Sequence, residues 1–141
     1  MNYFKITEFF FPEDYENMTP EKVLDVCEKL LKYHYPILND MRDKLNHPIF
    51  INAGYRSLDW ELSKGRSGTS QHTFEGLGAV DITTPDILVL NQLLELAKES
   101  DYKRVCYYPK QKFIHLDYNS SEYQYFEDYG QGWEFKGERD V

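Results

Sequence analysis

The segment FIHLD, residues 113–117, carries alternating apolar and polar side chains. On a β-strand, successive side chains point to opposite faces of the sheet. Ile114 and Leu116 therefore face one side, and His115 and Asp117 face the other. The segment predicts a strand with one face in a hydrophobic core and a polar pair on the other face.

The segment AVDIT, residues 79–83, shows the same alternation. Val80 and Ile82 are expected in the core, while Asp81 points to the opposite face. Two strands that each present a ligand-type side chain to one cleft can hold those side chains rigidly. We therefore expect a site on the polar face of a sheet that contains both segments.

A long helix is expected between Thr19 as its N-cap and Leu45, with Pro20 at the first helical position. Its apolar stripe recurs at three- and four-residue steps and consists of Val23, Cys27, Leu30, His34, Ile37, Met41 and Leu45. His34 lies on this stripe and is expected to be a hydrogen-bonded core residue rather than a ligand. Pro36 lacks an N–H and clashes with the preceding turn, so the helix should kink or break there.

A second helix is predicted over residues 84–100, capped by Thr84 with Pro85 in first position. Its core face is expected to consist of Ile87, Leu90, Leu94 and Ala97. Residues 47–54 predict a short buried strand, and residues 103–109 a strand that a turn at Pro109 joins to the segment 112–119.

The elements mix helices and strands without strict alternation, which is typical of an α+β fold. We expect a single domain over residues 1–141, with a small, mainly antiparallel sheet packed against the long kinked N-terminal helix and the second helix. Residues 55–78 are polar, with little regular pattern, and a segment of this length usually forms a functional loop. The acidic, aromatic tail, residues 119–141, is expected to form only an edge strand or a partner-facing flap.

The composition of the 141-residue chain argues against several classes of protein. Acidic residues outnumber basic ones, 24 to 16, and no dense run of Lys and Arg occurs, so we expect no nucleic-acid partner. No segment approaches the ~18 apolar residues of a membrane span, and the N-terminus lacks a secretory signal, which predicts synthesis in the cytoplasm. The oligomeric state is not set by the sequence, and we take the chain as a monomer.

His72, Asp81 and His115 make a ligand set that suits a catalytic zinc ion, which takes three protein ligands and keeps a fourth position for water. Cys27 and Cys106 lie far apart, without the spacing of a cysteine zinc site, and are expected to be free, buried thiols. From the spacing alone, a metal site and solvated loop residues both remain open.

The run INAGYRSLDWELSKGRSGTSQHTFEGLGAVDI, residues 51–82, followed by FIHLDY, residues 113–118, resembles the zinc D-alanyl-D-alanine metallopeptidase family. The family contains peptidoglycan carboxypeptidases and endopeptidases, and the likeness is strongest to short phage and prophage members. It covers roughly residues 3–118, including the start YFKITEFF and the helix with a proline in its middle. The resemblance implies a hedgehog-like zinc peptidase fold.

The resemblance makes His72, Asp81 and His115 the ligands of one Zn²⁺ ion. The usual interval between the first histidine and the aspartate in this family is shorter than the nine residues found here. The turn TFEGLG, residues 73–78, is therefore expected to contain an insertion, which a loop absorbs at low cost.

The resemblance also implies residues that bind substrate. Arg56 matches the arginine that holds a substrate carboxylate, for which a guanidinium offers a fixed fork of donors. Its alternative is a surface salt bridge. Ser70 matches the serine that shapes the cleft by hydrogen bonding. Apart from the resemblance, the candidates for the cleft wall are Tyr55, Trp60, Tyr107 and Tyr108, none of them expected to be catalytic.

The general base is the point at which the chain departs from the family. Many members carry Glu or Asp three residues before the last histidine, where this chain has Lys112. Asp117 and Glu75 are the candidates to replace it, and Asp117 is favoured because a strand fixes a carboxylate better than a loop. The alternative role for Asp117 is to orient His115 through the second nitrogen of the ring.

These features predict a zinc peptidase that hydrolyses a peptide bond in the stem or cross-link of bacterial peptidoglycan, of the endolysin or virion-associated type. The enzyme would reach the wall after lysis, by holin release or as part of a phage particle. The alternatives are a zinc-holding module that binds cell wall or a protein partner without cleavage, and a structural phage protein.

Overall fold

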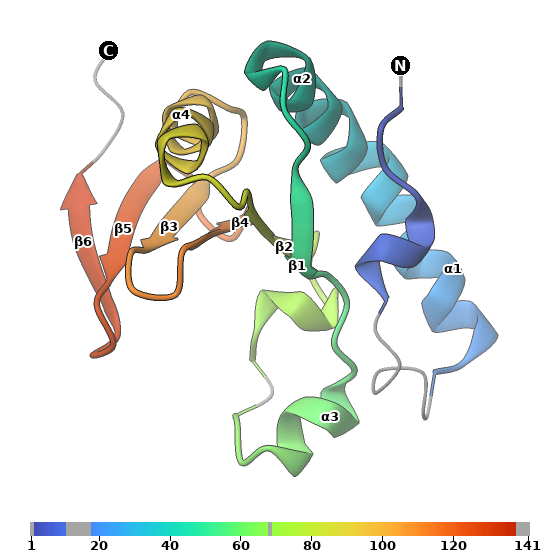
Figure 1. Cartoon of the computed structure of the whole chain (residues 1–141). Coiled ribbons are helices and arrows are strands. Elements are labelled where there is room, and N and C mark those ends of the chain that lie inside the picture. Colours follow the sequence, from blue (N-terminus) through green and yellow to red (C-terminus); the bar gives the residue numbers. More distant parts are fainter. Residues whose placement is uncertain (1, 11–17, 68, 138–141) are drawn as a thin grey trace.

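Residues 2–10, 18–67 and 69–137 are described by the computed structural model, which shows a six-stranded sheet with helices on its apolar face (Figure 1). The strands are β1 (Phe50–Ala53), β2 (Ala79–Thr83), β3 (Arg104–Tyr108), β4 (Phe113–Asp117), β5 (Gln124–Asp128) and β6 (Trp133–Gly137). Their order is β1-β2-β4-β3-β5-β6, and each neighbouring pair is antiparallel except β3 with β5. The predicted α+β fold with a mainly antiparallel sheet is confirmed.

The N-terminal helix is one continuous run made of α1 (Pro20–Lys29), a π-helical turn (Leu30–His34) and α2 (Tyr35–Leu45). As predicted, Thr19 caps it, because its hydroxyl accepts from the backbone N–H of Lys22 at 3.1 Å. The expected kink or break at Pro36 takes the form of the π turn just before it. A widened turn accommodates a ring that lacks an N–H without ending the helix.

The π turn also changes which residues face the core. The buried residues of the run are Val26, Leu30, His34, Tyr35, Leu38, Met41 and Leu45. Cys27 and Ile37, which the regular pattern places in the core, are only partly buried. One wide turn shifts the apolar stripe, which a 3.6-residue period cannot anticipate.

The second helix, α4 (Ile87–Lys98), begins later than predicted. Asp86 is its N-cap, because the carboxylate accepts from the N–H groups of Leu88 and Val89 at 2.8 and 3.3 Å. The predicted cap at Thr84 is therefore wrong. Ile87, which was predicted on the core face, is 46% exposed in this first turn, whereas Leu93, which was not predicted there, is fully buried.

Three segments, namely β1, residues 55–78 and the C-terminal tail, contain structure that the sequence prediction describes only in part. The short strand predicted over residues 47–54 forms as β1, but it is an edge strand with Phe50 half-exposed, so it is buried only in part. The polar segment 55–78 contains a short helix, α3 (Leu58–Ser63), capped by Ser57, and a 3-10 turn (Gln71–Thr73). The tail supplies β5 and β6, and residues 138–141 lie outside the described part of the chain.

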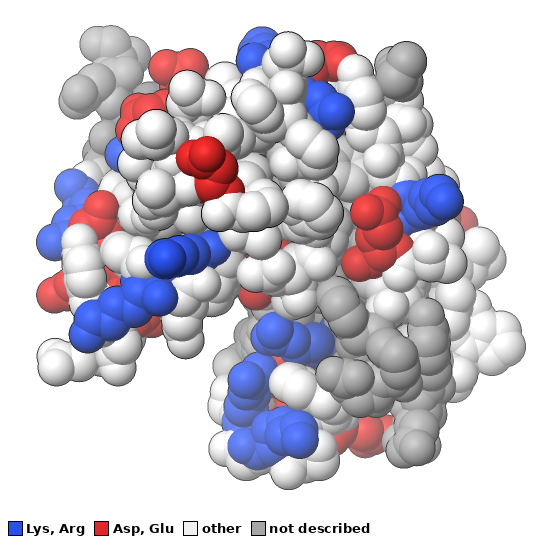
Figure 2. Space-filling model, viewed as in Figure 1, with Lys and Arg blue, Asp and Glu red and all other residues white. Residues whose placement is uncertain are grey.

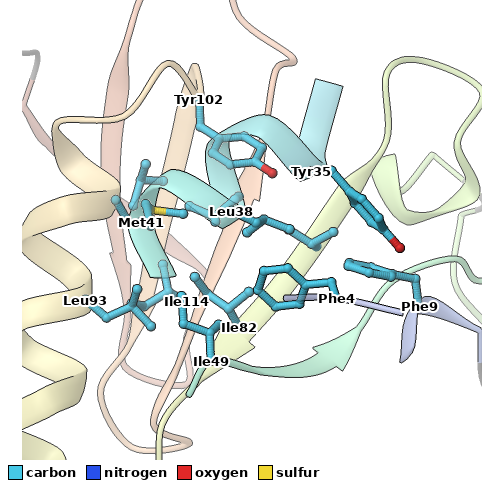
Figure 3. Packing of buried hydrophobic residues seen from close by; sticks show 14 of the residues in the cluster. Phe4, Phe9, Tyr35, Leu38, Met41, Ile49, Ile82, Leu93, Tyr102 and Ile114 are labelled. Atoms are coloured by element: carbon cyan, nitrogen blue, oxygen red, sulfur yellow. The ribbon is translucent and has the colours of Figure 1, made fainter. Parts of the chain in front are cut away.

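The hydrophobic core fills the space between the apolar face of the sheet and the helices (Figure 3). Ile82 from β2 and Ile114 from β4 meet Leu38, Met41 and Leu93 from the helices, all of them at most 2% exposed. The opposite face of β2 and β4 is free to carry polar groups. No helix in the described ranges is long and apolar enough to cross a membrane.

Candidate metal centre

Three buried side chains meet on the polar face of the sheet: His72 from the 3-10 turn, Asp81 from β2 and His115 from β4. Their ligand atoms all lie within 4.8 Å of one another. One oxygen of Asp81, Oδ1, is 3.2 Å from His72 Nε2 and 2.9 Å from His115 Nδ1. Asp81 and His115 are direct partners in the β2–β4 register, so the sheet itself brings them together.

Local hydrogen bonds fix the orientation of His72. Ser70 caps the 3-10 turn by accepting from the backbone N–H of His72 at 3.2 Å. The ring Nδ1–H donates to the carbonyl oxygen of Gly54 at 2.7 Å, so Nε2 is the ring nitrogen directed at Asp81. A side chain at Gly54 would approach the backbone oxygen of Phe9 to 2.5 Å, so this close approach requires glycine.

His115 is fixed from behind by Asp117. Its Nε2–H donates to Asp117 Oδ2 at 2.7 Å, so Nδ1 is the ring nitrogen that faces Asp81. Arg104 donates to both oxygens of Asp117, at 2.8 and 2.7 Å, and the backbone N–H of Asn119 donates to Oδ1. Asp117 is fully buried by these partners and does not line the cleft. This placement fits the orienting role rather than that of the favoured general base.

The charges of the cluster follow from these contacts. Burial opposes ionisation of Asp81, but His72 and His115 hold the pKa of its carboxyl well below its usual range. Burial also opposes a charge on His115, yet hydrogen bonds to Asp117 and Asp81 raise its pKa to about 9. A cation at this place would compete with the proton on His115.

The nitrogen and oxygen atoms of the cluster indicate which metal ion it could hold. Two imidazole nitrogens and a carboxylate oxygen converge, and each imidazole gives its other nitrogen to a carbonyl or carboxylate acceptor. Zinc sites in proteins are built in this way, since the outer hydrogen bond fixes the tautomer and strengthens the ligand. The residues present therefore fit a zinc ion.

The turn TFEGLG between the first two members of the cluster is tightly packed. Phe74 adopts a left-handed conformation, with φ of 57°, and its ring is fully buried. A side chain at Gly78, where φ is 93°, would come within 2.2 Å of that ring. His34 donates from Nε2–H to the carbonyl oxygen of Leu77 at 2.9 Å. The predicted core role of His34 is confirmed, and it anchors the turn.

Glu75 points away from the cluster. Its side chain is 72% exposed and pairs with Lys22 on α1, with Nζ 3.0 Å from Oε1. The same ammonium group donates to the carbonyl oxygen of Phe74 at 3.1 Å. Glu75 does not line the cleft, and neither does Asp117, so neither candidate base faces the space that a substrate would occupy.

A cleft of about 480 Å³ opens over the cluster. Besides the three cluster residues, its walls include Arg56, Arg66, Ser70, Tyr108 and Trp133. Figure 2 shows the molecule hollowed between the sheet and the lobe that contains α3, with Lys and Arg side chains on both sides. The surroundings of the hollow are thus basic, although the net charge of the chain is −8.

Two of the predicted substrate-binding residues reach this cleft and one does not. Arg56 lies with Nη2 4.0 Å from Asp81 Oδ2, and its guanidinium group stands 5.3 Å from the ring centre of Trp60. Ser70 lines the cleft beside it. Tyr55 is buried against the rings of Phe10 and Phe74, at 5.8 and 6.2 Å. The prediction that Tyr55 forms the cleft wall is therefore wrong.

Sequence reasoning missed Arg104 and Trp133. Arg104 is the cross-strand partner of Asp117, so pairing the two predicted strands through the turn at Pro109 would have found it. Trp133 belongs to β6, in a tail to which no pairing could be assigned from the sequence.

A family model described as Peptidase M15 matches residues 13–117 of this chain. The chain belongs to the M15 peptidase family. Members of this family are zinc metallopeptidases. The matched range contains the whole His72, Asp81 and His115 cluster and ends at Asp117, before β5 begins. A comparison with curated proteins finds no match.

Proposed function

We propose that the chain is a zinc-dependent peptidase that hydrolyses a peptide bond in the stem or cross-link of bacterial peptidoglycan. The observation that carries the proposal is the buried cluster of His72, Asp81 and His115 at the base of a cleft, in a member of the M15 family. These three residues would hold one zinc ion. When bound, zinc supplies Lewis acidity, which polarises a carbonyl group and makes water a stronger acid.

Arg56 is proposed to hold a carboxylate of the substrate. It lines the cleft, carries a permanent charge and is only loosely paired with Asp81, at 4.0 Å. A guanidinium group recognises a carboxylate through two parallel hydrogen bonds. Wall peptides end in D-Ala carboxylates and contain D-Glu, so they present such groups. Ser70 contributes by holding the turn that carries His72.

Asp117 is proposed to be a positioning residue. Its oxygens accept from His115, Arg104 and the backbone of Asn119, so the carboxylate keeps the His115 ring in the orientation that the cluster needs. Glu75 is proposed to hold the turn against α1 through Lys22.

One observation favours a second candidate, a zinc-holding module that binds wall peptide without cleavage. The usual acidic position is Lys112, and neither Asp117 nor Glu75 lines the cleft. For either function, we propose that the protein meets the wall after lysis, by holin release or as part of a phage particle.

The test is to incubate the zinc-loaded protein with defined muropeptides that contain D-Ala-D-Ala, L-Ala-D-Glu and cross-bridge bonds. Products are identified by mass spectrometry, with His115→Ala as the control. The proposal predicts cleavage of one bond type by the native chain and none by the variant. If the protein binds zinc one to one but cleaves no bond, the peptidase proposal fails and the non-catalytic binding module is supported.

A further inference from the structure

The hairpin of β5 and β6 lies beyond the family-matched range, yet it contributes a wall of the cleft. Trp133, the first residue of β6, has its ring centre 5.2 Å from that of His115, in an edge-to-face arrangement. The guanidinium group of Arg104 stands 4.8 Å from the centre of the same indole. The indole therefore contacts both a member of the cluster and the arginine that holds Asp117.

The hairpin fixes this indole firmly. β5 runs parallel to β3 with Phe126 beside Cys106, and β6 pairs with β5 so that Trp133 lies opposite Asp128. The Phe126 ring packs against the indole, with centres 5.0 Å apart. Long-range strand pairing thus places a tail residue beside His115 on the polar face.

The indole donates one hydrogen bond, from Nε1–H to the hydroxyl oxygen of Tyr108 at 2.6 Å. An indole has a donor and no acceptor, so the direction of this bond is fixed. The Tyr108 hydroxyl accepts from Trp133 and donates its own O–H, for which the thiol of Cys106, two residues earlier on β3, is the weak acceptor in the substrate-free chain. Tyr108 lines the cleft, and its ring is stacked on Phe113 with centres 4.2 Å apart.

We propose that Trp133 holds the Tyr108 hydroxyl as a hydrogen-bond donor to the scissile carbonyl of the substrate, which makes the C-terminal hairpin part of the catalytic machinery. The inference rests on the proposed peptidase function. Tyr108 is the residue that touches substrate, and Trp133 acts through it as a positioning residue.

The chemistry needs such a donor. In peptide hydrolysis the oxygen of water bonds to the acyl carbon, the C–N bond breaks and a proton passes to the leaving nitrogen. Negative charge builds on the carbonyl oxygen during the attack, and a fixed donor stabilises it. Burial raises the pKa of the Tyr108 phenol well above its usual value, so the group donates a hydrogen bond and keeps its proton.

The test compares Tyr108→Phe, Trp133→Phe and the double variant in the muropeptide assay. Tyr108→Phe keeps the stacked ring and should lower kcat about 100-fold, the effect of losing one such donor. Trp133→Phe should lower kcat about 10-fold, because the hydroxyl is retained but poorly aimed. The double variant should be no slower than Tyr108→Phe, since both changes affect one hydrogen bond. KM and zinc affinity should stay unchanged.

Two matched controls separate this role from a structural one. Tyr107→Phe removes the neighbouring hydroxyl, which the alternation of β3 places on the other face. Phe135→Leu changes an exposed ring on the same strand as Trp133. Both should retain wild-type kcat. A loss in Tyr107→Phe equal to that in Tyr108→Phe would overturn the proposal.

A second readout does not depend on activity. The chain has two tryptophans, so the indole N–H signal of Trp133 is readily assigned by NMR. Its hydrogen exchange should be slow in the native chain and in Tyr107→Phe and faster in Tyr108→Phe.

Unchanged exchange in Tyr108→Phe, kcat within twofold of wild type in that variant, or additive losses in the double variant would each overturn the inference while leaving the peptidase intact. A native chain that cleaves no muropeptide would overturn the proposed function itself, and the catalytic role of Tyr108 with it.

Discussion

The two faces of the β2–β4 pair have different roles, one in the hydrophobic core and the other in the metal cluster. On one face Ile82 and Ile114 are completely buried among the helices, and on the other Asp81 and His115 form the cluster beneath the cleft. Neighbouring residues on the same strand therefore serve different purposes. Stability and metal binding should therefore respond separately to substitutions that are one residue apart.

His115→Ala should give the largest effect. It removes one of three ligands without changing the apolar face, so the affinity for zinc should fall about a thousandfold or more and muropeptide cleavage should be lost. Zinc binding is measured by competition with a chromophoric chelator, and folding by circular dichroism. Retained zinc affinity in a folded variant would show that His115 is not a ligand.

Ile114→Ala is the matched change on the other face. Truncating a fully buried isoleucine leaves a cavity and should lower the free energy of unfolding by about 2–5 kcal/mol. The zinc affinity of the folded fraction should stay close to that of the native chain. Urea titrations of the metal-free and zinc-loaded forms measure both quantities. A loss of zinc affinity as large as that of His115→Ala would show that the two faces do not act separately.

On the core side of the sheet, His34 should make the free energy of unfolding depend on pH. Burial lowers the pKa of His34 to about 4, whereas an unfolded histidine titrates near 6.5. Between these values the unfolded chain binds more protons, so the stabilisation present above pH 6.5 should be lost as pH falls toward 4, by up to about 3 kcal/mol. Urea unfolding of the metal-free chain from pH 7 to 4 measures this, and His34→Gln should show a shallower decline. Parallel curves would contradict the assignment.

Asp117→Asn should have an intermediate effect. An amide cannot offer His115 and Arg104 the same charged acceptor, so the zinc affinity should fall about 10–100-fold while the ligands themselves remain. The chelator competition used for His115→Ala measures the change. Asp128→Asn, at the hairpin turn, is the control and should leave the affinity unchanged. Full zinc affinity combined with complete loss of cleavage would instead support the general-base role of Asp117.

Glu75→Gln should change least. Its salt bridge with Lys22 is mostly exposed, and such pairs contribute under about 1 kcal/mol. Cleavage rates should match those of the native chain across the active pH range. A loss of kcat of about 100-fold or more would identify Glu75 as the base after all.

Local alternation made much of the fold predictable, together with two members of the metal cluster, Asp81 and His115. Period-two patterns in residues 79–83 and 113–117 depend only on strand geometry, and the Thr19 cap depends only on neighbours. Asp86 was missed because three candidate start signals, Thr84, Pro85 and Asp86, stand side by side, and hydrogen bonding chooses among them.

The remaining features depend on contacts between distant segments. The π turn is a departure from the period on which the prediction rests. The role of Asp117 depends on which nitrogen of His115 faces the cluster, and that is set by Asp81 and Arg104 on neighbouring strands. Trp133 reaches the cleft only because β5 pairs in parallel with β3. Nothing local in the sequence specifies such a pairing.

Zinc analysis combined with X-ray absorption of the purified protein would show whether His72, Asp81 and His115 hold one zinc ion. If they do, the protein should contain one zinc per chain with nitrogen and oxygen ligands at about 2.0–2.1 Å. Absence of bound zinc, or a sulfur ligand at about 2.3 Å that would implicate Cys27 or Cys106, would contradict it.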